Sequence, residues 1–241
     1  SIKKKKGNSF HLTILTVQYI YMLLYKGRFY MDTHFFTKKE EIFHAITHGI
    51  GAVLSIAALV LLIIFASFNG DPALIVSVII FGVSMLFMYT SSTLVHSLPI
   101  GKWKSIFLII DHASIYVFIA GTYTPFLLVV LSGKVGWILF GIIWGIALTG
   151  IVLKVFFVKR FIILSTIAYI VMGWLITTVW NSLVEGIHEN GLILLVAGGI
   201  VYTVGAVFYV WHQIPYHHVI WHIFVLVGSI CHFFAVLFYV I

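Results

Sequence analysis

Long apolar tracts separated by short polar breaks make up the sequence from residue 31 to its end. Seven of these tracts are long enough to cross a bilayer as helices, at approximately 44–68, 73–96, 105–131, 135–158, 161–184, 191–211 and 217–241. A transmembrane helix needs about 20 mostly apolar residues, whereas a spanning strand alternates in polarity over about 10. The breaks between the tracts are too short to hold a soluble domain. The pattern therefore predicts an all-α integral membrane protein, with one seven-transmembrane helix bundle over residues 31–241.

Composition and charge agree with a membrane protein. The chain is 62% hydrophobic and 9% charged, whereas a soluble domain is about 25% charged. Six of its fourteen Lys and Arg residues lie in residues 1–30, and beyond residue 30 eight cations are balanced by seven acids. The net charge of +7 therefore marks no basic surface, and no nucleic-acid partner is expected. The single cysteine, Cys231, excludes an intrachain disulfide.

Residues 1–30 form a separate basic and apolar leader. Four lysines, Lys3 to Lys6, precede an apolar stretch at 12–25, as in a signal peptide, but no small-x-small cleavage site follows. The stretch from Lys26 to Met31 is compatible with purine-rich codons ahead of a start codon at Met31. We therefore expect residues 1–30 to be an upstream extension that is not part of the native protein.

The distribution of Lys and Arg predicts the orientation of the bundle. With the N-terminus inside, seven cations fall on the cytoplasmic side: Lys38, Lys39, Lys102, Lys104, Lys154, Lys159 and Arg160. Only Lys134 falls in an outside loop. Cytoplasmic loops carry the excess of Lys and Arg in membrane proteins, so the N-terminus is predicted inside and the C-terminus outside.

Four polar clusters interrupt the apolar tracts. They are Glu41, His44 and His48 in the first span, Ser92 and His96 in the second, Asp111 and His112 in the third, and His218 and His222 in the seventh. Ionisable side chains inside a membrane are costly, so each is a candidate functional residue. Under the predicted orientation all four clusters fall at the cytoplasmic ends of their helices. We therefore expect them to meet at one depth in the membrane.

Three of these histidines form a candidate metal site. His218 and His222 are four residues apart and so share a helix face, and His96 lies at a matching depth. Neutral imidazole is a good ligand for Zn²⁺, and three protein ligands leave a fourth position open, which is typical of catalytic zinc. Zinc held in this way can activate water for attack on an ester or amide carbonyl.

Other members of the clusters are assigned supporting roles. Asp111 is the candidate general base and Ser92 the candidate hydroxyl that bonds the water or the oxyanion, although Asp111 is also explained by a hydrogen bond to a neighbouring helix. Glu41 and His48 are candidates for holding the ligands in place from behind. Four more histidines are interpreted as packing or interface residues: His44, His112, His217 and His232.

From residue 31 to its end, the chain resembles the hemolysin III family, the bacterial branch of the progestin and adipoQ receptor group. The matching stretches are AITHGIGAVLSIAAL, SSTLVHSLP, DHASIYVFIAGTYTPF and HHVIWHIFVLVGSICHFF. The resemblance implies a zinc ion near the cytoplasmic face, held by the residues at positions 96, 218 and 222, with Asp111 and Ser92 beside it. Family members usually carry Asn at the position of His44, which argues against His44 as an essential ligand.

The resemblance leaves three hypotheses for the function. The group is similar to alkaline ceramidases, which favours a zinc-dependent hydrolase of a lipid amide or ester, with membrane lipids as its partners. The family name suggests a pore-forming cytolysin as the alternative, and the third hypothesis is a sensor or receptor of membrane state with structural zinc. The oligomeric state is left open by the sequence. The expected location is the bacterial plasma membrane, crossed several times.

Overall fold

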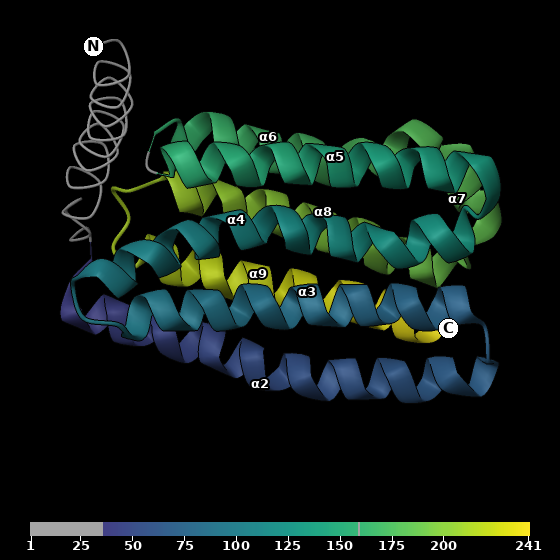
Figure 1. Cartoon of the computed structure of the whole chain (residues 1–241), viewed down its shortest axis with the longest axis horizontal. Coiled ribbons are helices and arrows are strands. Elements are labelled where there is room, and N and C mark those ends of the chain that lie inside the picture. The colour runs from purple at the N-terminus through teal and green to yellow at the C-terminus, as the bar shows by residue number, and fades with distance from the viewer. Residues whose placement is uncertain (1–35, 159) are drawn as a thin grey trace, which may run out of the picture.

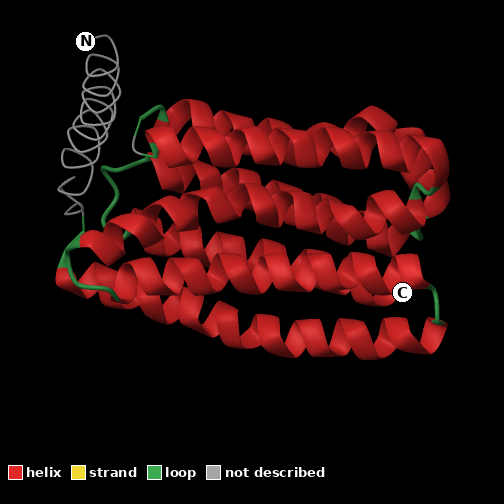
Figure 2. Cartoon of the chain, in the orientation of Figure 1, coloured by secondary structure: helices red, strands yellow, loops and turns green. Residues whose placement is uncertain are grey.

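The computed structural model describes residues 36–158 and 160–241, and this part of the chain is almost entirely helical and contains no strand (Figures 1 and 2). The leader at residues 1–30 and Lys159 lie outside the described residues. The helices are α2 (Lys38–Asn69), α3 (Pro72–Ser97), α4 (Lys102–Pro125), η1 (Phe126–Val130), α5 (Gly133–Phe157), α6 (Ile162–Trp174), η2 (Leu175–Val179), α7 (Trp180–Gly186), α8 (Glu189–Val210) and α9 (His217–Tyr239).

Seven helical units of the described chain are long and apolar enough to cross a membrane, counting α4 with η1 as one unit and α6 to α7 as another. The predicted seven-helix membrane bundle is therefore confirmed. The first unit begins earlier than residue 44 because Thr37 and Glu40 form a capping box. The Thr37 N–H donates to Glu40 Oε2 at 2.8 Å, and the Glu40 N–H donates to Thr37 Oγ1 at 3.3 Å. This early start places Glu41 within regular helix.

The spans lie along one common direction (Figure 1), and the contacts between them close the spans into a ring. Each span packs on the next along the chain, and α2 also packs against α9. The unit of α4 and η1 is the most buried of the seven. Helices α2, α4 and α9 begin, and α3 ends, at the left of Figure 1, which we call the site end. The four polar clusters are therefore carried to one end of the bundle, as the sequence predicts.

Two of the cations used to predict the orientation are buried in the protein. Lys104 is 6% exposed, and its Nζ donates to the Val95 carbonyl at 2.7 Å. Lys154 is 2% exposed, and its Nζ lies 5.9 Å from the centre of the Tyr169 ring. These two lysines have packing roles of their own. The orientation, with the N-terminus inside and the C-terminus outside, stays a prediction that rests on the other cations.

The fifth span is broken, although its sequence predicts one continuous helix over 161–184. Helix α6 ends at Trp174 and continues through the 3₁₀ turn η2 into α7. Such a break frees backbone groups that have no water to bond within a membrane. The Tyr123 hydroxyl satisfies them, since it donates to the Gly173 carbonyl at 2.7 Å and accepts from the Ile176 N–H at 2.9 Å. A side chain from α4 thus stabilises the break in α6.

Replacing Tyr123 with Phe should lower the free energy of unfolding by about 1–3 kcal/mol, because two buried backbone groups lose their partner. The measurement is unfolding of the purified protein in mixed micelles with increasing SDS. The control is Tyr239→Phe, since the Tyr239 hydroxyl has no hydrogen bond among the described residues. Equal losses in the two variants would contradict the proposed role of the Tyr123 hydroxyl.

Candidate metal centre

Three histidines from two helices converge at the site end. His96 lies in the last turn of α3, and His218 and His222 lie on one face of the first turns of α9. One ligating nitrogen from each lies within 4.8 Å of the other two. The structure therefore brings together the three residues that the sequence singles out, at a spacing that a single metal ion can bridge.

The His96 ring is held from behind by a carboxylate. Its Nδ1 lies 2.6 Å from Glu41 Oε2, and Glu41 Oε1 lies 3.0 Å from the Lys104 Nζ. The carboxylate can only accept from Nδ1–H, so the lone pair of the neutral ring is on Nε2. That Nε2 is buried and has no hydrogen-bond partner among the described residues. A ligating histidine bonded to a carboxylate in this way is the usual arrangement at metal centres.

The Thr47 hydroxyl orients the His222 ring, as Glu41 orients the His96 ring. Its Nδ1 lies 3.1 Å from Thr47 Oγ1, and that hydroxyl donates its one hydrogen to the Phe43 carbonyl at 2.8 Å. The hydroxyl oxygen is then free to accept from His222 Nδ1–H, which leaves the lone pair on Nε2. His48 stacks on the His222 ring with centroids 3.4 Å apart and planes 8° apart. Glu41, Thr47 and His48 thus fix the ligand rings from α2.

Asp111 and Ser92 lie beside the three histidines. The Ser92 side chain is next to the Asp111 carboxylate, and both line an internal cavity together with His218 and His222. Asp111 also lines a second cavity that contains His96. The carboxylate therefore faces both cavities that the histidines line.

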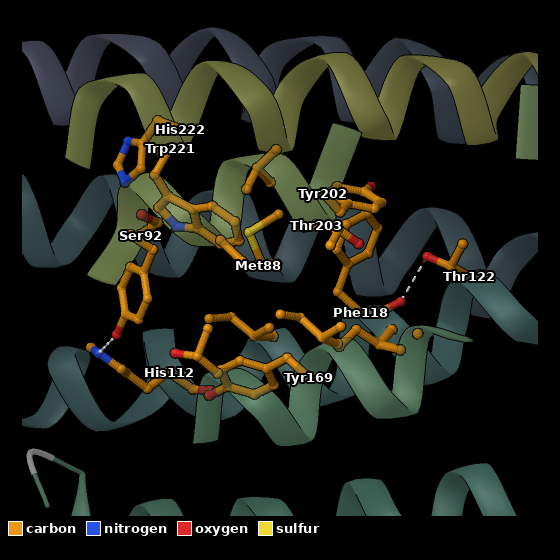
Figure 3. A pocket seen from close by; sticks show the side chains of 18 of the residues that line it. Met88, Ser92, His112, Phe118, Thr122, Tyr169, Tyr202, Thr203, Trp221 and His222 are labelled. Atoms are coloured by element: carbon orange, nitrogen blue, oxygen red, sulfur yellow. Dashed lines mark hydrogen bonds between the residues drawn. The ribbon is translucent and has the colours of Figure 1, made fainter. Parts of the chain in front are cut away.

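His112 is engaged elsewhere and is not free to bind a metal. Its Nδ1 lies 2.8 Å from the Leu108 carbonyl, and its Nε2 lies 3.2 Å from the Tyr209 hydroxyl (Figure 3). His217 bonds to the Phe208 carbonyl at 3.0 Å, and His232 to the Leu195 carbonyl at 3.0 Å. These three contacts agree with the packing roles that the sequence predicts.

The cluster sits where two cavities meet. One cavity opens at the site end and is lined by Glu41, His96 and Lys104 among others. The other runs inside the bundle from His222 and Ser92 toward Tyr202, Thr203 and Thr122 (Figure 3). Four residues line both cavities: Asp111, His112, Tyr209 and His218. A molecule in either cavity would therefore meet the histidines and the Asp111 carboxylate.

Sequence reasoning missed the part that Lys104, Thr47 and His44 have in this site. In the sequence Lys104 stands out only as one of the cytoplasmic cations, whereas in the structure it lies in the first turn of α4 and pairs with Glu41. Thr47 carried no signal, because a hydroxyl in a span usually bonds to its own helix backbone. His44 shares a helix face with Glu41 and His48, and its ring is wholly buried in the cluster, 4.6 Å from that of His96.

A seven-helix bundle with buried histidines and carboxylates at one end defines a multi-pass membrane protein with a candidate metal centre. Residues 36–233 match the family model described as Haemolysin-III related. The chain belongs to this family, and it is a multi-pass protein of the bacterial plasma membrane.

Relatives in bacteria match nearly the whole length. Hemolysin-3 of Bacillus cereus is 54% identical over 203 residues, which cover 84% of this chain and 93% of that protein. The Hemolysin-3 homolog of Bacillus subtilis strain 168 is 59% identical over 204 residues, which cover 85% of this chain and 96% of that protein. The human monocyte to macrophage differentiation factor is 28% identical over 169 residues, which cover 65% of this chain and 67% of that protein. This match is more distant than the two bacterial ones.

Replacing Glu41 with Gln should weaken metal binding by about 10- to 100-fold, because His96 loses its charged partner and Lys104 is left without a counter-charge. The measurement is competition between the metal-free protein in detergent and a chelator for Zn²⁺. Glu40→Gln is the matched control, since Gln also serves in a capping box. Unchanged affinity in Glu41→Gln would show that the carboxylate does not support the site.

Proposed function

We propose that the three histidines at positions 96, 218 and 222 hold a Zn²⁺ ion. The donor set supports this, because three neutral imidazoles are a common ligand set for catalytic zinc. The hydrogen bonds that Glu41 and Thr47 accept from the Nδ1–H groups of His96 and His222 support it further, since they leave the Nε2 lone pairs of both rings for a ligand. The buried, unpartnered His96 Nε2 is otherwise hard to explain, because buried polar atoms nearly always have a partner.

The function that this site supports best is hydrolysis of a lipid amide or ester. The observation that carries it is the Asp111 carboxylate, which lines the same internal cavity as two of the three convergent imidazoles, His218 and His222. Bound zinc would supply Lewis-acid activation of water and of the scissile carbonyl. Asp111 would accept the proton of the attacking water and return it to the leaving group. Ser92 would donate its one hydroxyl hydrogen to the developing oxyanion.

The substrate class follows from the internal cavity. Away from the cluster its walls are mainly apolar and aromatic, including Met88, Phe118, Ile119, Trp174 and Val225. The cavity also reaches Gly173 of α6, which is exposed. An acyl chain could therefore enter from the bilayer while its amide or ester carbonyl stays at the histidines. These features support membrane lipids as the partners of the site.

Cytolysis is the second candidate function, and the name Hemolysin-3 of the relative from Bacillus cereus favours it. A pore would act without the metal centre, so lysis of erythrocytes should survive replacement of all three histidines by Ala. A third candidate is a sensor of membrane state, in which removal of zinc would destabilise the bundle and no lipid would be cleaved. The hydrolase requires instead that lipid is cleaved and that cleavage is lost when the three histidines are replaced by Ala.

Asp111→Asn should lower lipid hydrolysis by about 10²- to 10⁴-fold while zinc is retained, because the amide cannot act as a base. The measurement is product release from short-chain ceramides and glycerolipid esters in mixed micelles, followed by mass spectrometry, with zinc content determined in parallel. Asp71→Asn is the control, since this aspartate only caps α3. A zinc-loaded Asp111→Asn protein with wild-type turnover would defeat the mechanism.

A further inference from the structure

A fourth imidazole lies among the three candidate ligands. His44 of α2 is fully buried, and neither of its ring nitrogens has a hydrogen-bond partner among the described residues. Buried polar atoms are nearly always paired, so two unpaired nitrogens on one ring point to a missing partner. Phe36 packs edge-on against this ring, with the two centroids 4.6 Å apart, and also contacts the rings of His96 and His218. The ring is therefore enclosed with the other histidines.

The four rings form a nearly regular tetrahedron. The centroid of the His44 ring is 4.6 Å from that of His96, 4.8 Å from His218 and 5.2 Å from His222. The other three edges are 5.4, 5.3 and 4.6 Å. With zinc–nitrogen bonds of about 2.0 Å, four imidazoles around one zinc ion would place their ring centres roughly 5 Å apart. The arrangement thus has the size and shape of a four-histidine zinc site.

His48 has the same unpaired nitrogens but cannot take this position. A metal ion lies in the plane of an imidazole that binds it. The His48 and His222 rings are stacked with planes 8° apart and centroids 3.4 Å apart, so one ion cannot lie in both planes. The His44 ring is inclined by 58°, 74° and 55° to the rings of His96, His218 and His222, so their planes intersect and can share one ion.

We propose that His44 is a fourth ligand, so that the resting protein holds zinc in a closed site of four imidazoles. In the structure one ring nitrogen of His44 lies within 4.8 Å of ligand atoms of Glu41 and His96, and not in the group formed by His96, His218 and His222. The His44 ring must therefore rotate about its Cβ–Cγ bond to direct a nitrogen at the shared ion. The inference rests on the zinc ion of the proposed function. It adds that turnover requires His44 to leave the ion and open a position for water.

X-ray absorption at the zinc edge of the zinc-loaded full chain tests this inference. The wild type should show four imidazole scatterers, and His44→Asn should show three with one oxygen and bind zinc at least 10-fold more weakly in chelator competition. His217→Asn is the matched control, because His217 also lies at the start of α9 but bonds to the Phe208 carbonyl. That variant should keep all four imidazoles.

The wild-type spectrum decides the question even if His44→Asn fails to fold. Three imidazoles and an oxygen in the wild type would overturn the four-ligand site and leave the proposed hydrolase standing. Four imidazoles in both the wild type and His44→Asn would also overturn it, since another residue would then be the ligand. A wild type that takes up no zinc would overturn this inference and the proposed function together.

Discussion

The carboxylate of Glu41 ties together the three helices that build the site. It accepts from His96 of α3 on one oxygen and pairs with Lys104 of α4 on the other, while its own backbone belongs to α2. Lys104 is buried and Glu41 is partly buried, so removing the carboxylate would leave a buried ammonium group without its counter-charge. The ends of three helices, the tautomer of His96 and the direction of its Nε2 therefore all depend on one side chain.

The rest of the bundle keeps this polar cluster surrounded by apolar surface. The ring of spans closes because α2 packs against α9, which brings Thr47 to His222 and His48 onto the same ring. Apolar side chains from five or more helices then line the cavity that leads away from the histidines. A site that is polar at one end and apolar along its length suits a molecule with a single reactive carbonyl and a long hydrocarbon chain.

Much of this arrangement could be predicted from the sequence, because it depends on local pattern and on the alternation of spans. Seven apolar tracts predict seven helices. Because successive spans cross the membrane in opposite directions, the clusters around His96, Asp111 and His222 are predicted to lie at one end of the bundle. The family resemblance is confirmed by relatives that match nearly the whole chain.

The remaining features depend on contacts between distant residues. The break after Trp174 is stabilised by Tyr123, about fifty residues earlier in the chain. The local sequence of α6 does not predict this break. The burial of Lys104 depends on where the end of α3 meets α2. The sequence predicts a packing role for His44, because its position relative to His96 of α3 and His218 of α9 is set by the packing of the helices. In the structure its ring lies within the histidine cluster.

The central claim is that the histidines at positions 96, 218 and 222 bind a metal ion. Elemental analysis of the detergent-purified protein, wild type beside His218→Ala, tests it most directly. The account predicts about one zinc ion per chain in the wild type and a large loss in the variant, because removing one of two ligands on the same helix face opens the site. A wild type without metal, or equal metal in both proteins, would contradict the claim.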